Sequence, residues 1–169
     1  MTRVTSRLAA ARDAAAIARI YNEGIADRIA TFETEPRSVE EIARILTERE
    51  PRWPTVVVEH DGEVVGWAGA SEYRPRACYA GVADFSVYVA RDARGSGAGR
   101  IAMETLIAAC TDRGIWKLVS RVFPENVASR RLLSRVGFRE VGTYRRHGKL
   151  DGEWRDTVIV ERLIGDAER

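Results

Sequence analysis

Hydrophobic residues recur at helical spacing in four stretches of the chain. In the first, which starts at about Asp13, the side chains of Ile17, Ile20 and Tyr21 fall on one face. A capping-box pair precedes the second stretch, and a glycine follows each of the last two. The sequence therefore predicts one helix from about residue 13 to a loop over 26–36, a second after Ser38, a third over 97–113 and a fourth over 126–136.

Shorter runs rich in β-branched and aromatic residues alternate with these helices and predict strands. The runs on either side of Asp61-Gly62 are expected to form a hairpin, because this dipeptide favours a tight turn. The order of elements predicts a single domain over 1–169, of α/β class, with helices flanking a mixed sheet. The predicted strands cover 4–8, 55–59, 64–70, 85–89, 117–122, 139–144 and 154–163, with a glycine-containing connection between the last two.

The charge of the chain argues against a nucleic-acid partner. The 169 residues include 27 basic and 25 acidic side chains, a net charge of +2, and the basic residues are dispersed among acids. No apolar stretch approaches the length of a membrane span, and the N-terminus lacks the apolar core of a signal peptide. We therefore expect a cytoplasmic protein without nucleic-acid or membrane partners, whose specificity lies in local sites.

The two cysteines predict neither a disulfide framework nor a metal site, because no C-x-x-C or histidine pair accompanies them. Cys110 shares an apolar helical face with Met103 and Leu106, which is typical of a core residue. Cys78 lies in a polar loop, and no base adjoins it in the sequence. A reduced thiol is the expectation for both.

A glycine-dense loop between a predicted strand and a predicted helix is the strongest functional signal. Gly95, Gly97 and Gly99 allow successive backbone amides to converge on an anion, and the following helix adds the positive end of its dipole. A plain connecting turn is the alternative. The dinucleotide fingerprint G-x-G-x-x-G does not fit, since Arg100 stands where its last glycine should be.

The motif R-x-x-G-x-G, read as Arg94, Gly97 and Gly99 after the strand over 85–89, resembles the pyrophosphate-binding motif of the GNAT superfamily of acetyl-CoA-dependent N-acyltransferases. The resemblance continues through the segment 126–138, which carries N-x-x-S and L-x-x-x-G-F. The stretches 20–36 and 148–156 look like the branch that acetylates phosphinothricin, methionine sulfoximine or arsinothricin. This likeness implies the GNAT fold, a mixed, mostly antiparallel sheet of about seven strands with about four helices.

The resemblance also implies how acetyl-CoA is held. Backbone amides of the loop would bind its pyrophosphate, with added charge from an arginine, and the strand before the loop would offer its backbone to the pantetheine arm and to the acetyl carbonyl. The alternative for the arginines is a solvated helix start. The residues expected at this coenzyme site are Val87, Tyr88, Val89, Arg94, Gly95, Ser96, Gly97, Ala98, Gly99, Asn126 and Ser129.

Asp84 lies in an apolar run ahead of this strand, where a carboxylate serves either as a strand-end hydrogen-bonding group or as a base. The resemblance favours the base, although relatives usually have glutamate there; the shorter aspartate favours proton transfer through water. It also implies that Arg74 binds the substrate carboxylate and that Phe32 forms a pocket wall. Asp151 replaces a histidine of phosphinothricin-specific relatives, and His147 lies near it but out of register.

The sequence thus favours an N-acetyltransferase that moves an acetyl group directly from acetyl-CoA to the α-amino group of a small amino-acid-like substrate. Acetylation of peptide or protein N-termini is one alternative. A non-catalytic acyl-CoA-binding regulatory module is another. Because relatives are commonly homodimers, the resemblance also implies a second copy of the chain as a partner, with no metal at the site.

Overall fold

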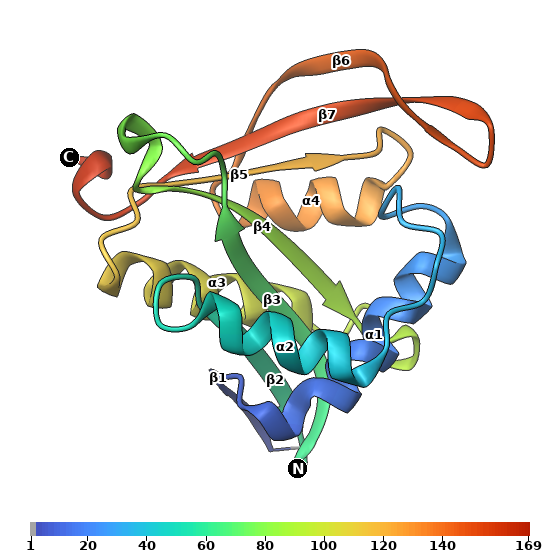
Figure 1. Ribbon diagram of the computed structural model, residues 1–169, viewed down its shortest axis with the longest axis vertical. Helices are drawn as coiled ribbons and strands as arrows, with labels where there is room; N and C mark the ends of the chain where they lie inside the picture. Colours follow the sequence, from blue (N-terminus) through green and yellow to red (C-terminus); the bar gives the residue numbers. More distant parts are fainter. Residues whose placement is uncertain (1–2) are drawn as a thin grey trace.

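One seven-stranded sheet organises the computed structural model, which describes residues 3–169 (Figure 1). Within the described residues, β4 and β5 are the one parallel pair; the other neighbouring strands are antiparallel. The expected GNAT architecture is therefore confirmed. In sheet order the strands are β1 (Val4–Leu8), β2 (Thr55–His60), β3 (Glu63–Glu72), β4 (Val82–Val89), β5 (Lys117–Val122), β7 (Glu153–Leu163) and β6 (Arg139–Leu150).

The four predicted helices are present and cover the two faces of the sheet. Helices α1 (Ala14–Asp27) and α2 (Val39–Arg49) lie on one face. Helices α3 (Ala98–Asp112) and α4 (Val127–Arg135) lie on the other. Each helix buries an apolar stripe against the strands, so two hydrophobic clusters form, one on each side of the sheet.

Local sequence signals account for several helix and strand ends. The Ser38 hydroxyl accepts from the Glu41 amide at 3.1 Å, and the Glu41 carboxylate accepts from the Ser38 amide at 2.9 Å. This reciprocal pair begins α2 as a capping box. Asp61 and Gly62 adopt φ angles of +51° and +87°, which suit a two-residue hairpin turn between β2 and β3.

Three predicted boundaries are wrong. Helix α1 continues into the predicted loop as far as Asp27, and the left-handed conformation of Arg28 ends it. Strand β4 begins at Val82, so Asp84 lies inside the strand instead of at its entry. Strand β6 runs on to Leu150 instead of ending at Tyr144. An irregularity in the β6–β7 pairing after Tyr144 breaks the two-residue alternation by which the rest of the strand would be recognised.

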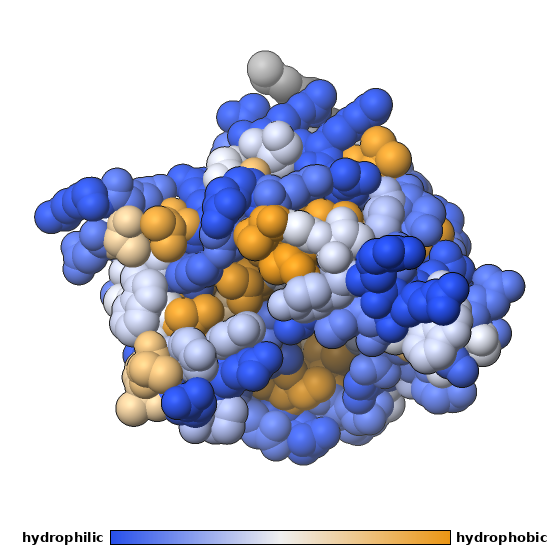
Figure 2. Space-filling view, turned by 90° about the horizontal axis from the view of Figure 1, so that it is seen from above, coloured by the Kyte–Doolittle hydropathy of each residue, from blue (hydrophilic) through white to orange (hydrophobic). Residues whose placement is uncertain are grey.

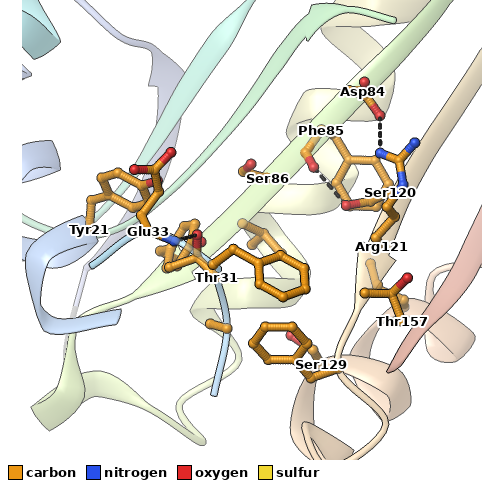
Figure 3. A pocket seen from close by; sticks show the side chains of 16 residues that line it. Tyr21, Thr31, Glu33, Asp84, Phe85, Ser86, Ser120, Arg121, Ser129 and Thr157 are labelled. Carbon is orange, nitrogen blue, oxygen red and sulfur yellow. Dashed lines mark hydrogen bonds and ion pairs between the residues drawn. The ribbon is translucent and has the colours of Figure 1, made fainter. Parts of the chain in front are cut away.

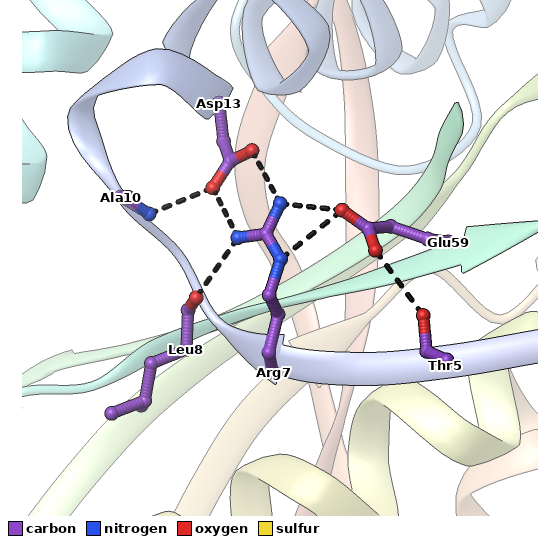
Figure 4. A network of polar contacts seen from close by, with 6 residues as sticks. All are labelled: Thr5, Arg7, Leu8, Ala10, Asp13 and Glu59. Atoms are coloured by element: carbon purple, nitrogen blue, oxygen red, sulfur yellow. Dashed lines mark hydrogen bonds and ion pairs between the residues drawn. The ribbon is translucent and has the colours of Figure 1, made fainter. Parts of the chain in front are cut away.

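A network of charges around Arg7 fixes β1 to the start of α1 (Figure 4). The Arg7 guanidinium donates to both carboxylate oxygens of Asp13, at 2.7 and 2.9 Å, and its Nε donates to Glu59 at 3.1 Å. The Asp13 side chain is only 5% exposed, and it also accepts from the Ala10 amide. The hydrogen bonds from Arg7 lower the pKa of Asp13 below its usual value.

Replacing Arg7 with methionine is expected to destabilise the fold by about 3 kcal/mol at pH 7, because it leaves the buried Asp13 carboxylate without its cation. The folded-state pKa of Asp13 is lowered. The ionised Asp13 therefore makes its full contribution to the free energy of unfolding above its unfolded pKa of about 4, and this contribution is lost as the pH falls through the folded-state pKa. The stability gap between wild type and Arg7→Met should therefore narrow with acidification. Urea unfolding at pH 7 and pH 3 measures this, with Arg145→Met on the exposed face of β6 as a control; a constant gap would contradict it.

Candidate active site

Strands β4 and β5 separate part-way along their length. Their parallel pairing comprises only three residue pairs and ends at Asp84 and Val119. One step further, the Ser120 hydroxyl donates to the Phe85 carbonyl at 2.9 Å (Figure 3). Beyond this contact, no strand pairs with β4 on that side among the described residues.

The divergence leaves backbone groups of β4 free. Ala90 donates to the Val65 carbonyl of the neighbouring strand. Because residues of an antiparallel ladder bond alternately to one side and the other, the amides and carbonyls of Val87 and Val89 point away from β3 and toward the gap. Of these groups, the Val89 carbonyl accepts from the Arg94 Nε at 3.5 Å. The strand backbone is predicted to meet the pantetheine arm in this gap. The Tyr88 amide turns toward β3, so the free amides near it belong to Val87 and Val89.

A cavity of 310 Å³ opens at this divergence. Figure 3 shows side chains from β4, β5, α4 and the α1–α2 loop turned toward it. Seen from above the view of Figure 1, the surface is hollowed near its centre, with hydrophobic side chains in the hollow and hydrophilic ones around it (Figure 2). Of the expected site residues, those that line the cavity are Phe32, Asp84, Val87, Tyr88 and Ser129.

Asp84 presents a half-buried carboxylate to this cavity. Burial raises the pKa of the Asp84 carboxyl, and the positive charges of Arg121 and Arg74 oppose this increase without cancelling it. The Arg121 guanidinium nitrogen lies 3.8 Å from the Asp84 carboxylate oxygen. A carboxylate with a raised pKa binds a proton more readily, so Asp84 has the properties of a general base.

Arg121 also lines the cavity, although no sequence pattern indicated it. Its position follows from the short parallel pairing, which sets Val119 beside Asp84 and so brings the next residues of β5 to the cavity. If the strands predicted over 85–89 and 117–122 are paired in parallel, Ser120 and Arg121 are placed near Asp84. Sequence spacing alone does not place them there, because these residues are far from Asp84 along the chain.

The glycine loop has the geometry of an anion site. Gly95 and Gly97 adopt φ angles of +79° and +90°, and a Cβ at either would meet nothing within 4 Å. Within residues 3–169, the amides of Gly95, Gly97, Gly99 and Arg100 donate to no protein acceptor. These open amides at the start of α3 fit a bound pyrophosphate.

The buried glycine of the loop serves packing instead. A Cβ at Gly99 would lie 3.0 Å from Leu132 of α4 and 3.4 Å from Val89 of β4. Gly99 therefore lets α3 approach both elements, while Gly95 and Gly97 leave the outer surface of the loop open to a ligand.

Two other expected coenzyme residues have side-chain contacts within the protein, and a third lies outside the cavity lining. The Arg94 guanidinium lies 2.7 Å from the Asp27 carboxylate of α1, so it joins the loop to that helix. The Asn126 side chain accepts from the Ser129 amide at 3.2 Å and caps α4. Val89 does not line the cavity. Direct binding of the coenzyme by these side chains stays a prediction.

Replacing Gly97 with valine is expected to weaken acetyl-CoA binding by several-fold while the fold persists, because a β-branched residue at φ +90° costs roughly 1–3 kcal/mol and displaces the loop amides. Calorimetry measures the affinity and circular dichroism the fold. Gly62→Val is the matched control, since Gly62 has a φ of +87° and equally open surroundings in the β2–β3 turn. Equal affinities in Gly97→Val and the control would remove the loop from the coenzyme site.

Phe32 forms part of the cavity wall; its contact with the substrate stays a prediction. Its ring meets Phe123 edge-on, with 4.9 Å between ring centroids. On the other side the backbone of Gly148 approaches so closely that a Cβ there would lie 2.8 Å from the Phe32 ring. The β6–β7 hairpin and β5 thus hold the α1–α2 loop in place at the cavity.

Arg74 and Asp151 lie outside the cavity lining. Arg74 is exposed and rests over the ring of Tyr73, at 5.2 Å from its centroid, yet its charge acts on Asp84. Asp151 sits in the turn between β6 and β7, where it pairs with Arg28 at 3.0 Å. His147 is exposed on β6 beside Tyr144. Roles for these residues in binding the substrate stay predictions.

The remaining chemistry of the described part of the chain is limited. Burial raises the pKa of the Cys110 thiol to about 12, which agrees with its prediction as a core residue, and Cys78 is exposed. No group of three or more potential metal ligands occurs in residues 3–169. No helix there is long and apolar enough to cross a membrane.

The diverging strands, the open glycine loop and the carboxylate at the cavity fit a protein that binds an acidic coenzyme beside a base. Comparison with known families agrees: the model of the Acetyltransferase (GNAT) family matches residues 17–138, and the chain belongs to this family. It is an acetyl-CoA-dependent N-acetyltransferase.

Three relatives show which members it is similar to. The chain is 37% identical over 163 residues to phosphinothricin N-acetyltransferase of Alcaligenes faecalis, covering 95% of this chain and 82% of that protein. It is 29% identical over 157 residues to L-methionine sulfoximine/L-methionine sulfone acetyltransferase of Pseudomonas aeruginosa, covering 92% and 91%. The crystal structure of a phosphinothricin acetyltransferase from Sinorhizobium meliloti in complex with acetyl-CoA has a TM-score of 0.88 and 32% identity, covering 96% and 89%.

Proposed function

We propose that this enzyme acetylates the α-amino group of a small amino acid by direct transfer while donor and acceptor are bound together. The observation that carries the proposal is the position of Asp84. Its carboxylate opens onto the same cavity as the unpaired edge of β4. A base and a donor site that share one cavity need no covalent enzyme intermediate. The buried Cys110 is also unsuited to carry an acetyl group, because it lies in the core and the pKa of its thiol is raised.

The chain offers candidate groups for the first steps of the transfer. The coenzyme supplies the acetyl thioester. Asp84 accepts the proton of the acceptor ammonium, directly or through water, so that a neutral amine is available. The amine attacks the acetyl carbon, the carbon–sulfur bond breaks, and the coenzyme thiolate leaves and takes up a proton from solvent. The inward amides of Val87 and Val89 are suited to stabilise the oxyanion that forms at the acetyl carbonyl. The amides of Gly95 to Gly99 hold the pyrophosphate away from the reacting atoms.

The acceptor we propose is an amino acid whose side chain carries a tetrahedral oxyanion or its mimic, of the phosphinothricin, methionine sulfoximine or arsinothricin type. The names of the relatives support this class. The positive charges near Asp84 support it as well, because Arg121 and Arg74 both act on that carboxylate and can attract an anionic acceptor.

An acceptor panel tests the proposal. Purified enzyme and acetyl-CoA would be incubated with phosphinothricin, methionine sulfoximine, arsinothricin, a neutral amino acid, a peptide with a free N-terminus and a polyamine. Thiol release measures turnover, and mass spectrometry locates the acetyl group. We expect the first three acceptors to react fastest, at the α-amine. Preference for the peptide or the polyamine would overturn the acceptor assignment.

The assembly and location of the enzyme also belong to the proposal. Exposed apolar side chains on the β6–β7 hairpin, among them Val141, Tyr144 and Trp154, support a homodimer, since such groups favour burial against a partner. The cytoplasm, where acetyl-CoA is available, is the location we propose.

A further inference from the structure

A second cavity, of 220 Å³, lies beside the first, between α1, α2 and the sheet. Tyr21, Glu33 and Ser86 line both cavities, so the two are neighbours. We propose that the second cavity is the far compartment of the acceptor site, in which Arg49 binds the side-chain oxyanion of the acceptor. This inference rests on the proposed function and specifies which residue recognises the distal acidic group.

The floor of the second cavity is a row of small side chains across three strands. Thr55 of β2 pairs with Gly69 of β3, and Gly69 pairs with Ser86 of β4. Directly paired residues of a sheet point to the same face, so this row leaves space under α2. The neighbouring row on the same face is bulky, because Trp67 stacks on Tyr88 with 5.2 Å between ring centroids. The cavity therefore lies where the side chains are smallest.

Arg49 reaches into this space from the end of α2. A Cβ built at Gly69 would lie 3.6 Å from the Arg49 Nη1 and 3.2 Å from the Thr55 hydroxyl. The guanidinium is thus held over the middle of the sheet, and the absence of a side chain at Gly69 makes room for it.

The Arg49 guanidinium has no hydrogen-bond or ion-pair partner anywhere in residues 3–169. Two carboxylates in its surroundings are already paired: Glu33, which lines the same cavity, lies 3.1 Å from Arg37, and Glu48, whose charge acts on Arg49, lies 2.9 Å from Arg44. Burial lowers the pKa of Arg49, which shows that its charge is partly removed from water. A desolvated cation without a counterion destabilises a fold, and an anionic ligand offsets that cost.

The distance between the compartments suits one acceptor molecule. Asp84 and Ser86 are two residues apart on β4 and point to the same face, which separates them by roughly 7 Å. An acceptor with its amine at Asp84 extends past Ser86 to bring an oxyanion several bonds away to Arg49. Arg74, near Asp84, then remains for the α-carboxylate, which is attached one carbon from the amine.

The test compares Arg49→Met with Arg44→Met, which removes an exposed arginine from the same helix. With phosphinothricin as acceptor, we expect Arg49→Met to raise KM about tenfold or more. With methionine, whose side chain carries no charge, KM should stay within twofold. The melting temperature should not fall, because the variant removes an unpaired, partly buried charge. Arg44→Met should resemble wild type in all three measurements.

A second measurement does not depend on turnover. Dimethylphosphinate has an oxyanion but neither amine nor carboxylate, and its methyl resonance broadens on binding. With saturating coenzyme A present to occupy the glycine loop, the probe should bind wild type and Arg44→Met but not Arg49→Met. If phosphinothricin is a good substrate and Arg49→Met alters neither KM nor probe binding, the compartment assignment is wrong. If the probe binds through Arg49 while no such amino acid is acetylated, the compartment stands and the proposed acceptor fails.

Discussion

Replacing Asp84 with asparagine is expected to lower the turnover number by about 10²–10⁴-fold, the usual cost of losing a general base. Acetyl-CoA affinity should change little, because the glycine loop follows the other end of β4 and leads into α3. In wild type, activity should fall at low pH as Asp84 becomes protonated, with an apparent pKa above the usual value since burial raises it. Steady-state kinetics across pH 4–10 measures both effects.

In Asp84→Asn this acidic limb should disappear, and activity should rise steadily toward alkaline pH because more of the acceptor amine is already neutral. Asp84→Glu keeps a carboxylate and should retain a large part of the activity. Asp112→Asn, an exposed acid at the end of α3, controls for the loss of one charge. A wild-type rate and pH profile in Asp84→Asn would show that another group accepts the proton.

Sequence patterns predicted the parts of the fold that depend on nearby residues. The capping box of Ser38, the turn at Asp61 and the glycine loop are local structures, and each has the predicted geometry. Cys110 was placed in the core because helical spacing reports which face is apolar. Such features need no knowledge of how distant segments pair.

The parts that were missed depend on contacts between distant segments. Arg121 reaches Asp84 only because β5 runs parallel to β4 for three residue pairs. Arg49 lies in a helix whose sequence carries a capping box but no ligand-binding motif, and the space around its guanidinium follows only from the small side chains of three paired strands. The end of β6 was missed because its irregular pairing obscures the alternation.

These contacts between distant segments also add candidate arginines for binding an anionic acceptor. The sequence indicated one arginine, Arg74, whereas the structure adds Arg121 beside the base and Arg49 in the neighbouring cavity. The three occupy different positions relative to Asp84. If these arginines bind different acidic groups of one acceptor, as proposed, single substitutions should separate binding of the α-carboxylate from binding of the side-chain oxyanion.

Arg74→Ala is accordingly expected to raise KM for phosphinothricin-type acceptors by roughly 10–150-fold, which corresponds to about 1.5–3 kcal/mol for a lost charged hydrogen bond. Unlike Arg49→Met, it should raise KM for methionine as well, because every α-amino acid carries the carboxylate that Arg74 is proposed to bind. Acetyl-CoA binding should be unchanged. Initial-rate kinetics with both acceptors, and calorimetry for the coenzyme, measure these effects.

The matched control is Arg76→Ala. Arg76 belongs to the same exposed loop and rests over Tyr79 much as Arg74 rests over Tyr73, at 5.7 Å and 5.2 Å from the ring centroids. Arg74, but not Arg76, contributes to the pKa of Asp84, so the control should leave KM near the wild-type value. Arg121→Ala completes the comparison. If KM rises in Arg121→Ala and not in Arg74→Ala, the carboxylate is bound by the arginine that lines the cavity, and the role proposed for Arg74 is wrong.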